Sequence, residues 1–211
     1  AYTNGMFSTT AQYPNINGTV TDHDDIGGDN TGEKGNEDVF DVSRDMILIH
    51  TKLTDKYFTE SCDTYNEDYT YSDMNVNINN SVYVTGKLNL DGNISLNNAV
   101  GAVSDVDLSG GNLNGNNTVI YSKFGDIDIS NSQASVNGLI YAPFGTVTID
   151  CDNFNMNGLI IAQNVVIDGY GANINYSSSW AELVGTESEE LSWTFDDWQY
   201  LADTDDDGLP N

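Results

Sequence analysis

Apolar and polar residues alternate over several short stretches in the second half of the chain. The apolar positions of these stretches are Val106, Leu108, Ile127, Ile129, Val147 and Ile149. The polar positions that alternate with them are Asp105, Asp107, Asp126, Asp128, Thr146 and Thr148. Because successive side chains of a β-strand point to opposite faces, this pattern predicts strands with an apolar inner face and a polar outer face.

The same stretches belong to a repeat of about 20 residues. The segment Asn117-Thr-Val-Ile-Tyr-Ser-Lys-Phe-Gly-Asp-Ile-Asp-Ile129 aligns with Asn137-Gly-Leu-Ile-Tyr-Ala-Pro-Phe-Gly-Thr-Val-Thr-Ile149. One asparagine recurs through the strong and weak copies, at Asn79, Asn97, Asn117, Asn137, Asn157 and Asn175. Equivalent positions of stacked coils lie about 4.8 Å apart, a spacing at which side-chain amides form a hydrogen-bonded ladder. The repeat predicts an all-β, right-handed parallel β-helix in which this asparagine column is structural.

The rest of the chain divides around this repeat. The segment Ile16-Asn17-Gly18-Thr19-Val20 has the local pattern of a coil, and an amphipathic helix is expected over about residues 37–61. We therefore expect five parts: a first coil (1–21), a loop and helical insertion packing on the solenoid (22–74), the β-helix coils (75–178), a C-terminal cap (179–202) and the start of a calcium-binding repeat (203–211).

Six outward positions form an apolar strip over three coils. They are Val119, Tyr121, Leu139, Tyr141, Leu159 and Ile161. A contiguous apolar strip of this size is expected either to be covered by another part of the chain or to serve as a binding surface. Two explanations remain open: the helix of the insertion covers the strip, or the strip is a ligand face for a partner such as a flat polysaccharide. His50, within that helix, is interpreted as a packing residue.

Charge narrows the range of partners. With 6 basic and 33 acidic residues, the formal net charge is -27. Such a surface repels nucleic acid and anionic membranes, and it attracts divalent cations. Four carboxylates crowd two neighbouring coils, namely Asp105, Asp107, Asp126 and Asp128, which we call the acidic columns. We interpret them as solvated aspartates, with a bridging metal as the alternative.

The most specific chemical motif stands at Asp203-Thr-Asp205-Asp-Asp207-Gly208-Leu209. Aspartates at positions 1, 3 and 5 of a calcium loop supply oxygens, glycine at position 6 permits the sharp turn, and position 7 supplies a backbone carbonyl. The motif predicts a calcium site with Asp203, Asp205, Asp207 and Leu209 as ligands. Before it, Trp180, Trp193 and Trp198 are expected to cap the solenoid, with a carbohydrate platform as the alternative.

The repeat resembles the parallel β-helix domains of secreted and pilus-associated bacterial surface proteins, and the final residues resemble a thrombospondin type 3 calcium repeat. The resemblance covers about residues 75–178 and 203–211, and it implies no catalytic residues. Cys62 and Cys151 are either bonded to each other or two free thiols.

We therefore predict a non-catalytic module of a larger bacterial cell-surface protein, with a structural or adhesive role. Its expected partners are the rest of the parent polypeptide and a polysaccharide or another surface protein, without nucleic acid or membrane insertion. The alternative is a protein that binds or degrades polysaccharide, with Asp126 and Asp128 as a hydrolytic pair. An ice- or mineral-binding array is disfavoured, because only Thr146 and Thr148 supply outward threonines.

Overall fold

The computed structural model describes residues 49–180 in full, and before them the backbone of helix α1 and of short strands between Tyr2 and Lys34. The helix is α1 (Val42–Tyr57). The strands are β1 (Tyr2–Thr3), β2 (Met6–Thr9), β3 (Tyr13–Asn17), β4 (Thr19–Asp22), β5 (Asp25–Ile26), β6 (Glu33–Lys34), β7 (Asp63–Tyr65), β8 (Tyr69–Ile78), β9 (Val82–Val84), β10 (Leu88–Leu96), β11 (Val100–Ala102), β12 (Val106–Ser122) and β13 (Ile127–Tyr176).

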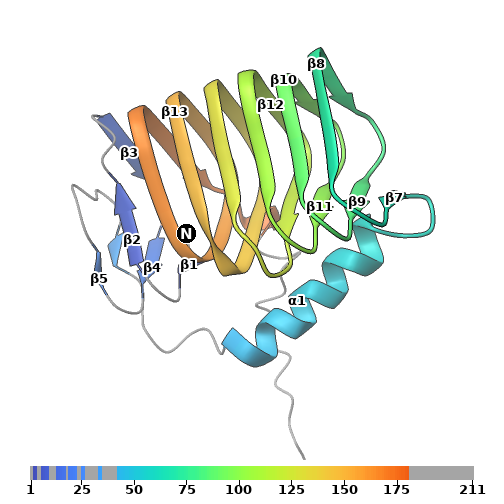
Figure 1. Ribbon diagram of the computed structural model, residues 1–211. Coiled ribbons are helices and arrows are strands. Elements are labelled where there is room, and N and C mark those ends of the chain that lie inside the picture. Colours follow the sequence, from blue (N-terminus) through green and yellow to red (C-terminus); the bar gives the residue numbers. More distant parts are fainter. Residues whose placement is uncertain are drawn as a thin grey trace, which may run out of the picture.

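Strands β7 to β13 wind into a parallel β-solenoid of about four turns of roughly 19 residues each (Figure 1). Each coil pairs in parallel with its neighbours, as in the register that sets Asp107 opposite Asp128. The predicted fold class is confirmed. Within the described part of the chain, no helix is long and apolar enough to cross a membrane.

The interior of the stack is filled by the apolar half of the alternating pattern. Val106 lies opposite Ile127 and Leu108 opposite Ile129, and all four side chains are fully buried. Burying an aliphatic side chain of this size is worth about 1.5–3 kcal/mol relative to leaving it in water. Continuous inward columns of this kind therefore hold the coils together, while the outward columns are free for other roles.

The N-terminal strands lie at the opposite end of the stack from the one expected for a first coil. Strand β3 pairs with the last part of β13, with Tyr13 opposite Gly171 and Asn17 opposite Asn175. Strands β1 and β2 pair with the preceding part of the same coil, and β4 pairs with β1. Strands β1 to β3, which lie within residues 1–21, thus follow the last repeat coil in space (Figure 1). Sequence order alone does not determine where a coil stacks.

The helical insertion is shorter than predicted. Its helix is described over Val42–Tyr57 and ends before the predicted residue 61. The solenoid begins at Asp63 rather than at residue 75, because β7 pairs with β9 and β8 with β10. Three half-buried tyrosines pack against the core here, namely Tyr65, Tyr69 and Tyr71. Aromatic rings thus replace the aliphatic residues of the repeat at this end, which concealed the coil.

The structure departs from the predicted asparagine ladder at Asn117. Asn97 Nδ2 donates to Asn79 Oδ1 at 3.0 Å, as a ladder requires. Further along, Asn116 and not Asn117 lies opposite Asn137. Asn117 is the extra residue at the register shift, and its φ of 51° lies in the left-handed region that asparagine tolerates better than most residues.

Candidate functional site

The first acidic column, which contains Asp105 and Asp126, holds neighbouring coils together through hydrogen bonds to the backbone. Asp105 Oδ1 accepts the backbone N–H of Asp126 at 3.0 Å, and Asp126 Oδ1 accepts that of Thr146 at 2.7 Å. Two coils before Asp105, Asp68 Oδ1 accepts the N–H of Lys87 at 2.8 Å. Each carboxylate therefore binds the N–H that lies one coil further along the stack.

A glycine precedes each of these N–H groups for a steric reason. A Cβ on Gly125 would lie 2.3 Å from Asp105 Oδ1, and one on Gly86 would lie 2.1 Å from Asp68 Oδ1. A side chain at either position would displace the carboxylate from the backbone it binds. The glycine and the aspartate one coil away thus form one structural unit.

The negative charge of the second acidic column, which contains Asp107 and Asp128, is partly neutralised by Lys87. Lys87 Nζ lies 2.7 Å from Asp107 Oδ2 and 4.0 Å from Asp105 Oδ2. The hydrogen bond to Asp107 raises the pKa of Lys87 above its ordinary value. Asp128 Oδ1 accepts the hydroxyl of Ser130 at 2.6 Å. Among the described residues there is no cluster of three or more His, Cys, Asp or Glu able to hold a metal ion.

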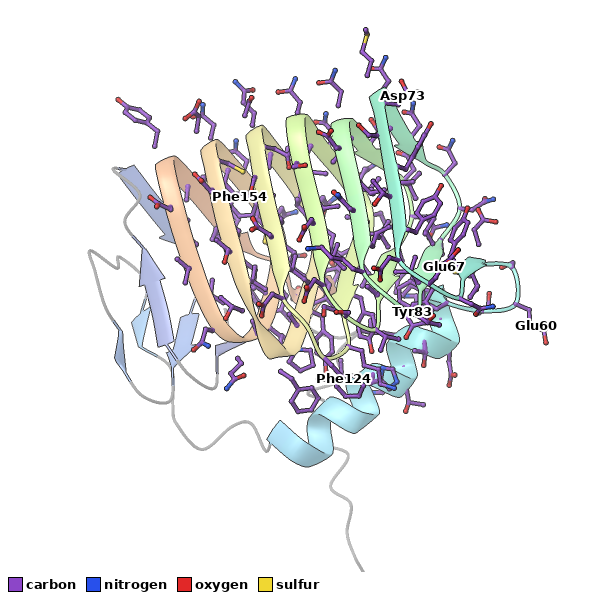
Figure 2. All side chains as sticks on the ribbon, in the orientation of Figure 1. Glu60, Glu67, Asp73, Tyr83, Phe124 and Phe154 are labelled. Atoms are coloured by element: carbon purple, nitrogen blue, oxygen red, sulfur yellow. The ribbon has the colours of Figure 1, made fainter. Side chains whose placement is uncertain are left out.

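The apolar strip is covered, so the alternative in which it forms an exposed ligand face does not hold. Its six residues, Val119, Tyr121, Leu139, Tyr141, Leu159 and Ile161, are all buried. They form one cluster with Ile49 and Leu53 of helix α1 and with Trp180. Figure 2 places Tyr83, which packs on this cluster, next to the helix. The strip is therefore a second hydrophobic core between the solenoid wall and α1.

Stacked aromatic rings run through this second core. Tyr121 and Tyr141 are nearly parallel, with ring centroids 5.8 Å apart, and Phe58 packs against Tyr83 and Tyr121. Desolvation by burial raises the pKa of Tyr121 and Tyr141 far above the ordinary tyrosine range. These phenols therefore stay protonated while the chain is folded.

His50 has a specific partner that the sequence did not reveal. Its Nδ1 is hydrogen-bonded to the hydroxyl of Tyr121, and the two rings stack with centroids 5.7 Å apart. Burial lowers the pKa of His50, and the charge of Lys123 lowers it further. A neutral imidazole is thus favoured where helix α1 meets the wall.

The cysteines are both free. Cys151 is buried in the solenoid core, where its Sγ lies 3.5 Å from the carbonyl oxygen of Ile129. Cys62 is partly exposed beside β7 at one end of the stack. Burial raises the pKa of both thiols. Cys62 and Cys151 could have formed a disulfide or remained free, and the structure supports free thiols.

The C-terminal predictions lie mostly outside the described residues. This applies to the calcium ligands Asp203, Asp205, Asp207 and Leu209, and to Trp193 and Trp198. Trp180 is described, and its buried ring covers the apolar strip rather than forming a carbohydrate platform.

A groove that the sequence did not indicate lies at another corner of the stack. Its volume is about 300 Å³, and its lining residues are Asn153, Phe154, Asn155, Tyr170, Gly171, Ala172 and Asn173. The side chains of Phe154 and Ala172 point into the solenoid core, and Figure 2 labels Phe154 within the stack. Among the described residues, the polar lining is therefore made of asparagine amides and one tyrosine, and we call this feature the amide groove. In the sequence this groove corresponds to Gly171, which stands where the neighbouring coil has Asn153, and this relation is known only once the register between the coils is known.

No protein-family model, curated protein or solved structure matches the chain. Arguments about its function therefore rest on its own residues and on the resemblance of their pattern described above.

Proposed function

We propose that this chain is a non-catalytic module of a larger bacterial cell-surface protein, exposed to the extracellular space, with a structural or adhesive role. The observation that carries the proposal is the use of Asp105 and Asp126 as acceptors for backbone N–H groups of the next coil. Asp126, one of the two candidate hydrolytic carboxylates, thus binds the backbone of the neighbouring coil, and this contact supports a structural role. A second face of the solenoid is occupied by helix α1.

The main alternative is a polysaccharide hydrolase that uses Asp126 and Asp128. Such an enzyme needs one carboxylic acid and one carboxylate on either side of the scissile bond. Asp126 and Asp128 instead lie side by side on the outer face of one solenoid wall, on either side of the inward-facing Ile127. Asp126 accepts a hydrogen bond from the Thr146 N–H, and Asp128 accepts one from the Ser130 hydroxyl. This arrangement favours a structural role for both.

Charge and sequence resemblance support the remaining parts of the proposal. A net charge of -27 disfavours nucleic acid and anionic membranes as partners. The likeness of the repeat to β-helix domains of secreted and pilus-associated proteins supports the surface location. The Asp203-to-Leu209 motif supports a calcium site that stiffens the connection to the rest of the parent polypeptide.

The test is an assay for new reducing ends and unsaturated products on pectic and neutral polysaccharides, with and without calcium. We expect no turnover above the blank under either condition. Turnover that disappears in Asp128→Asn, with an unchanged melting temperature, would overturn the proposal. Calcium is tested separately by titration calorimetry of the chain extended into its parent sequence, where Asp205→Asn should abolish the heat of binding.

A further inference from the structure

Strand β8 is the outermost strand at the end of the solenoid opposite β3 (Figure 1). It pairs with β10, and no other described strand pairs with it. Tyr69 donates its backbone N–H to the carbonyl oxygen of Lys87 at 2.8 Å. Because the backbone groups of successive strand residues point to opposite sides, those of the exposed Thr70 and Ser72 point away from the stack. We call this segment, Tyr69–Ser72, the β8 edge.

The β8 edge lacks the devices that commonly prevent edge strands from pairing. Such strands are often blunted by lysine, by proline or by a β-bulge. Strand β8 contains neither lysine nor proline, and its register shift lies beyond the edge, between Ser72 and Asn75. At the opposite end of the repeat coils, by contrast, β3 pairs with the last part of β13. The backbone at the β8 edge is therefore able to accept a further strand.

Tyrosine rings close the core beside this edge. Tyr69 lies opposite Leu88 in one inward column, and Tyr71 is its counterpart in the next. Leu88 is fully buried, whereas both tyrosines are only half-buried, because no described coil stacks beyond them. Tyr65 stacks on Tyr69 with ring centroids 3.9 Å apart. These amphipathic rings offer contacts to the side chains of an added strand, and the faces of tyrosine rings attract cations.

The formal charge of this end coil is entirely negative. Residues 57–86 contain no lysine, arginine or histidine, and their five acidic residues are all exposed, namely Glu60, Asp63, Glu67, Asp68 and Asp73. Figure 2 shows Glu60, Glu67 and Asp73 around the end coil. A second copy of the chain at this edge would bring equal charges face to face, which electrostatic repulsion opposes. A cationic strand is the complementary occupant.

We propose that the β8 edge binds an extended, cationic segment of another surface protein, which adds a strand to the solenoid. Backbone hydrogen bonds to Thr70 and Ser72 supply affinity, as in other cases of strand addition. Basic side chains of the segment pair with the surrounding carboxylates and lie on the tyrosine rings, which supplies specificity. This inference rests on the adhesive part of the function proposed above, and it names the chemistry of the partner.

The experiment titrates the full chain with a short, capped peptide that alternates lysine and valine, followed by NMR. We expect a Kd below about 1 mM at low ionic strength, with amide shifts centred on residues 63–73. Methylation of alternate backbone nitrogens keeps the charge of the peptide but removes its hydrogen-bond donors, so it should weaken binding by at least about tenfold. Replacement of the lysines by glutamates should abolish binding, because the peptide then carries the same charge as the end coil.

Variants of the chain test the same contacts. Thr70→Pro removes an outward N–H at a position where an edge strand tolerates proline, and it should weaken binding by about fivefold to tenfold. Glu60→Gln combined with Glu67→Gln removes two exposed carboxylates and should weaken binding by about threefold to tenfold. Asp150→Asn combined with Asp152→Asn is the matched control. Both carboxylates are exposed but lie several coils from β8, beyond a Debye length of about 8 Å, so affinity should not change.

Three outcomes would overturn the proposal, and they separate it from the broader function. If the peptide does not bind up to about 1 mM, or shifts only the acidic columns, the β8 edge is not a site for a cationic strand, and the structural role stands. If the methylated peptide binds equally well, charge alone and not strand addition explains the binding. If sedimentation of the free chain shows a dimer that Thr70→Pro abolishes, the occupant is a second copy.

The proposal remains testable if Thr70→Pro lowers stability. The methylated peptide is used with the unaltered chain, and Glu60 and Glu67 are exposed side chains whose replacement by glutamine leaves the backbone as it is. The polysaccharide assay described above tests the broader function independently of both.

Discussion

The hydroxyl of Tyr121 is hydrogen-bonded to Nδ1 of His50, and this contact joins the solenoid wall to helix α1. Tyr121 belongs to a column of the repeat, whereas His50 belongs to a segment without any counterpart in the repeat. The contact therefore links two parts of the chain that have separate sequence patterns. Its acid sensitivity follows from the environment of His50.

We expect the docking of helix α1 to weaken in mild acid. Burial lowers the pKa of His50 below 6.5 in the folded chain, so the unfolded chain binds the proton more tightly. The stabilising contribution is therefore complete above pH 6.5, and it is lost as the pH falls from 6.5 through the lowered pKa. Urea unfolding between about pH 8 and about pH 5 measures the effect as a fall in the free energy of unfolding.

The matched control for this acid effect is His50→Gln, which has a polar side chain that does not titrate. The other acidic and basic groups titrate equally in both proteins, so the difference between the two pH profiles isolates His50. Parallel profiles for wild type and variant would contradict the prediction.

Leu53→Ala should destabilise the chain by about 2–5 kcal/mol, because it leaves a cavity between the helix and the apolar strip. Leu53 is fully buried in the second core, whereas Lys52 beside it is exposed. Lys52→Ala should therefore change the free energy of unfolding by no more than about 0.5 kcal/mol. Chemical unfolding monitored by intrinsic fluorescence measures the free energy of unfolding of both variants. Equal effects of the two changes would show that helix α1 does not depend on this packing.

Asp126→Ala should cost about 1 kcal/mol of stability, because the N–H of Thr146 loses its acceptor. Asp126→Asn keeps an oxygen in the same place and removes one negative charge, so it should be close to neutral. The melting temperature of each variant should be the same in calcium as in a chelator. A calcium-dependent loss in either variant would instead identify Asp126 as a metal ligand.

Gly158→Ala should destabilise the chain by about 1–3 kcal/mol, because its Cβ would lie 1.8 Å from a backbone oxygen of the neighbouring coil. Gly171→Ala is the comparison, since its Cβ would have only ordinary contacts with the described residues. We expect it to leave the melting temperature unchanged or to raise it slightly. A larger loss for Gly171→Ala than for Gly158→Ala would contradict this steric comparison.

The solenoid could be predicted because its pattern is local and repeated. The 20-residue offset correctly set Tyr121 opposite Tyr141, and the alternation correctly placed Ile127 and Ile129 inside. The ladder prediction failed at Asn117 because two asparagines are adjacent there, and only the backbone conformation shows that Asn116 is the one in register.

Other features depend on contacts between distant segments, and the sequence could not settle them. The apolar strip was visible as a strip, but only the packing of Leu53 and Trp180 shows what covers it. The amide groove could not be predicted, because Gly171 is unusual only in comparison with Asn153 of the neighbouring coil. The acidic columns were seen as charge, whereas their hydrogen bonds depend on Gly125 one coil away.

The position of β3 has a consequence for biosynthesis. Its residues Tyr13–Asn17 leave the ribosome early, yet their partners Gly171–Asn175 are made near the end of this sequence. At typical rates of about 5–20 residues per second, the strand waits on the order of 10 s for the edge on which it pairs. The coils between Asp63 and Tyr176 are thus able to stack first, and strand β3, synthesised before them, pairs only after they are made.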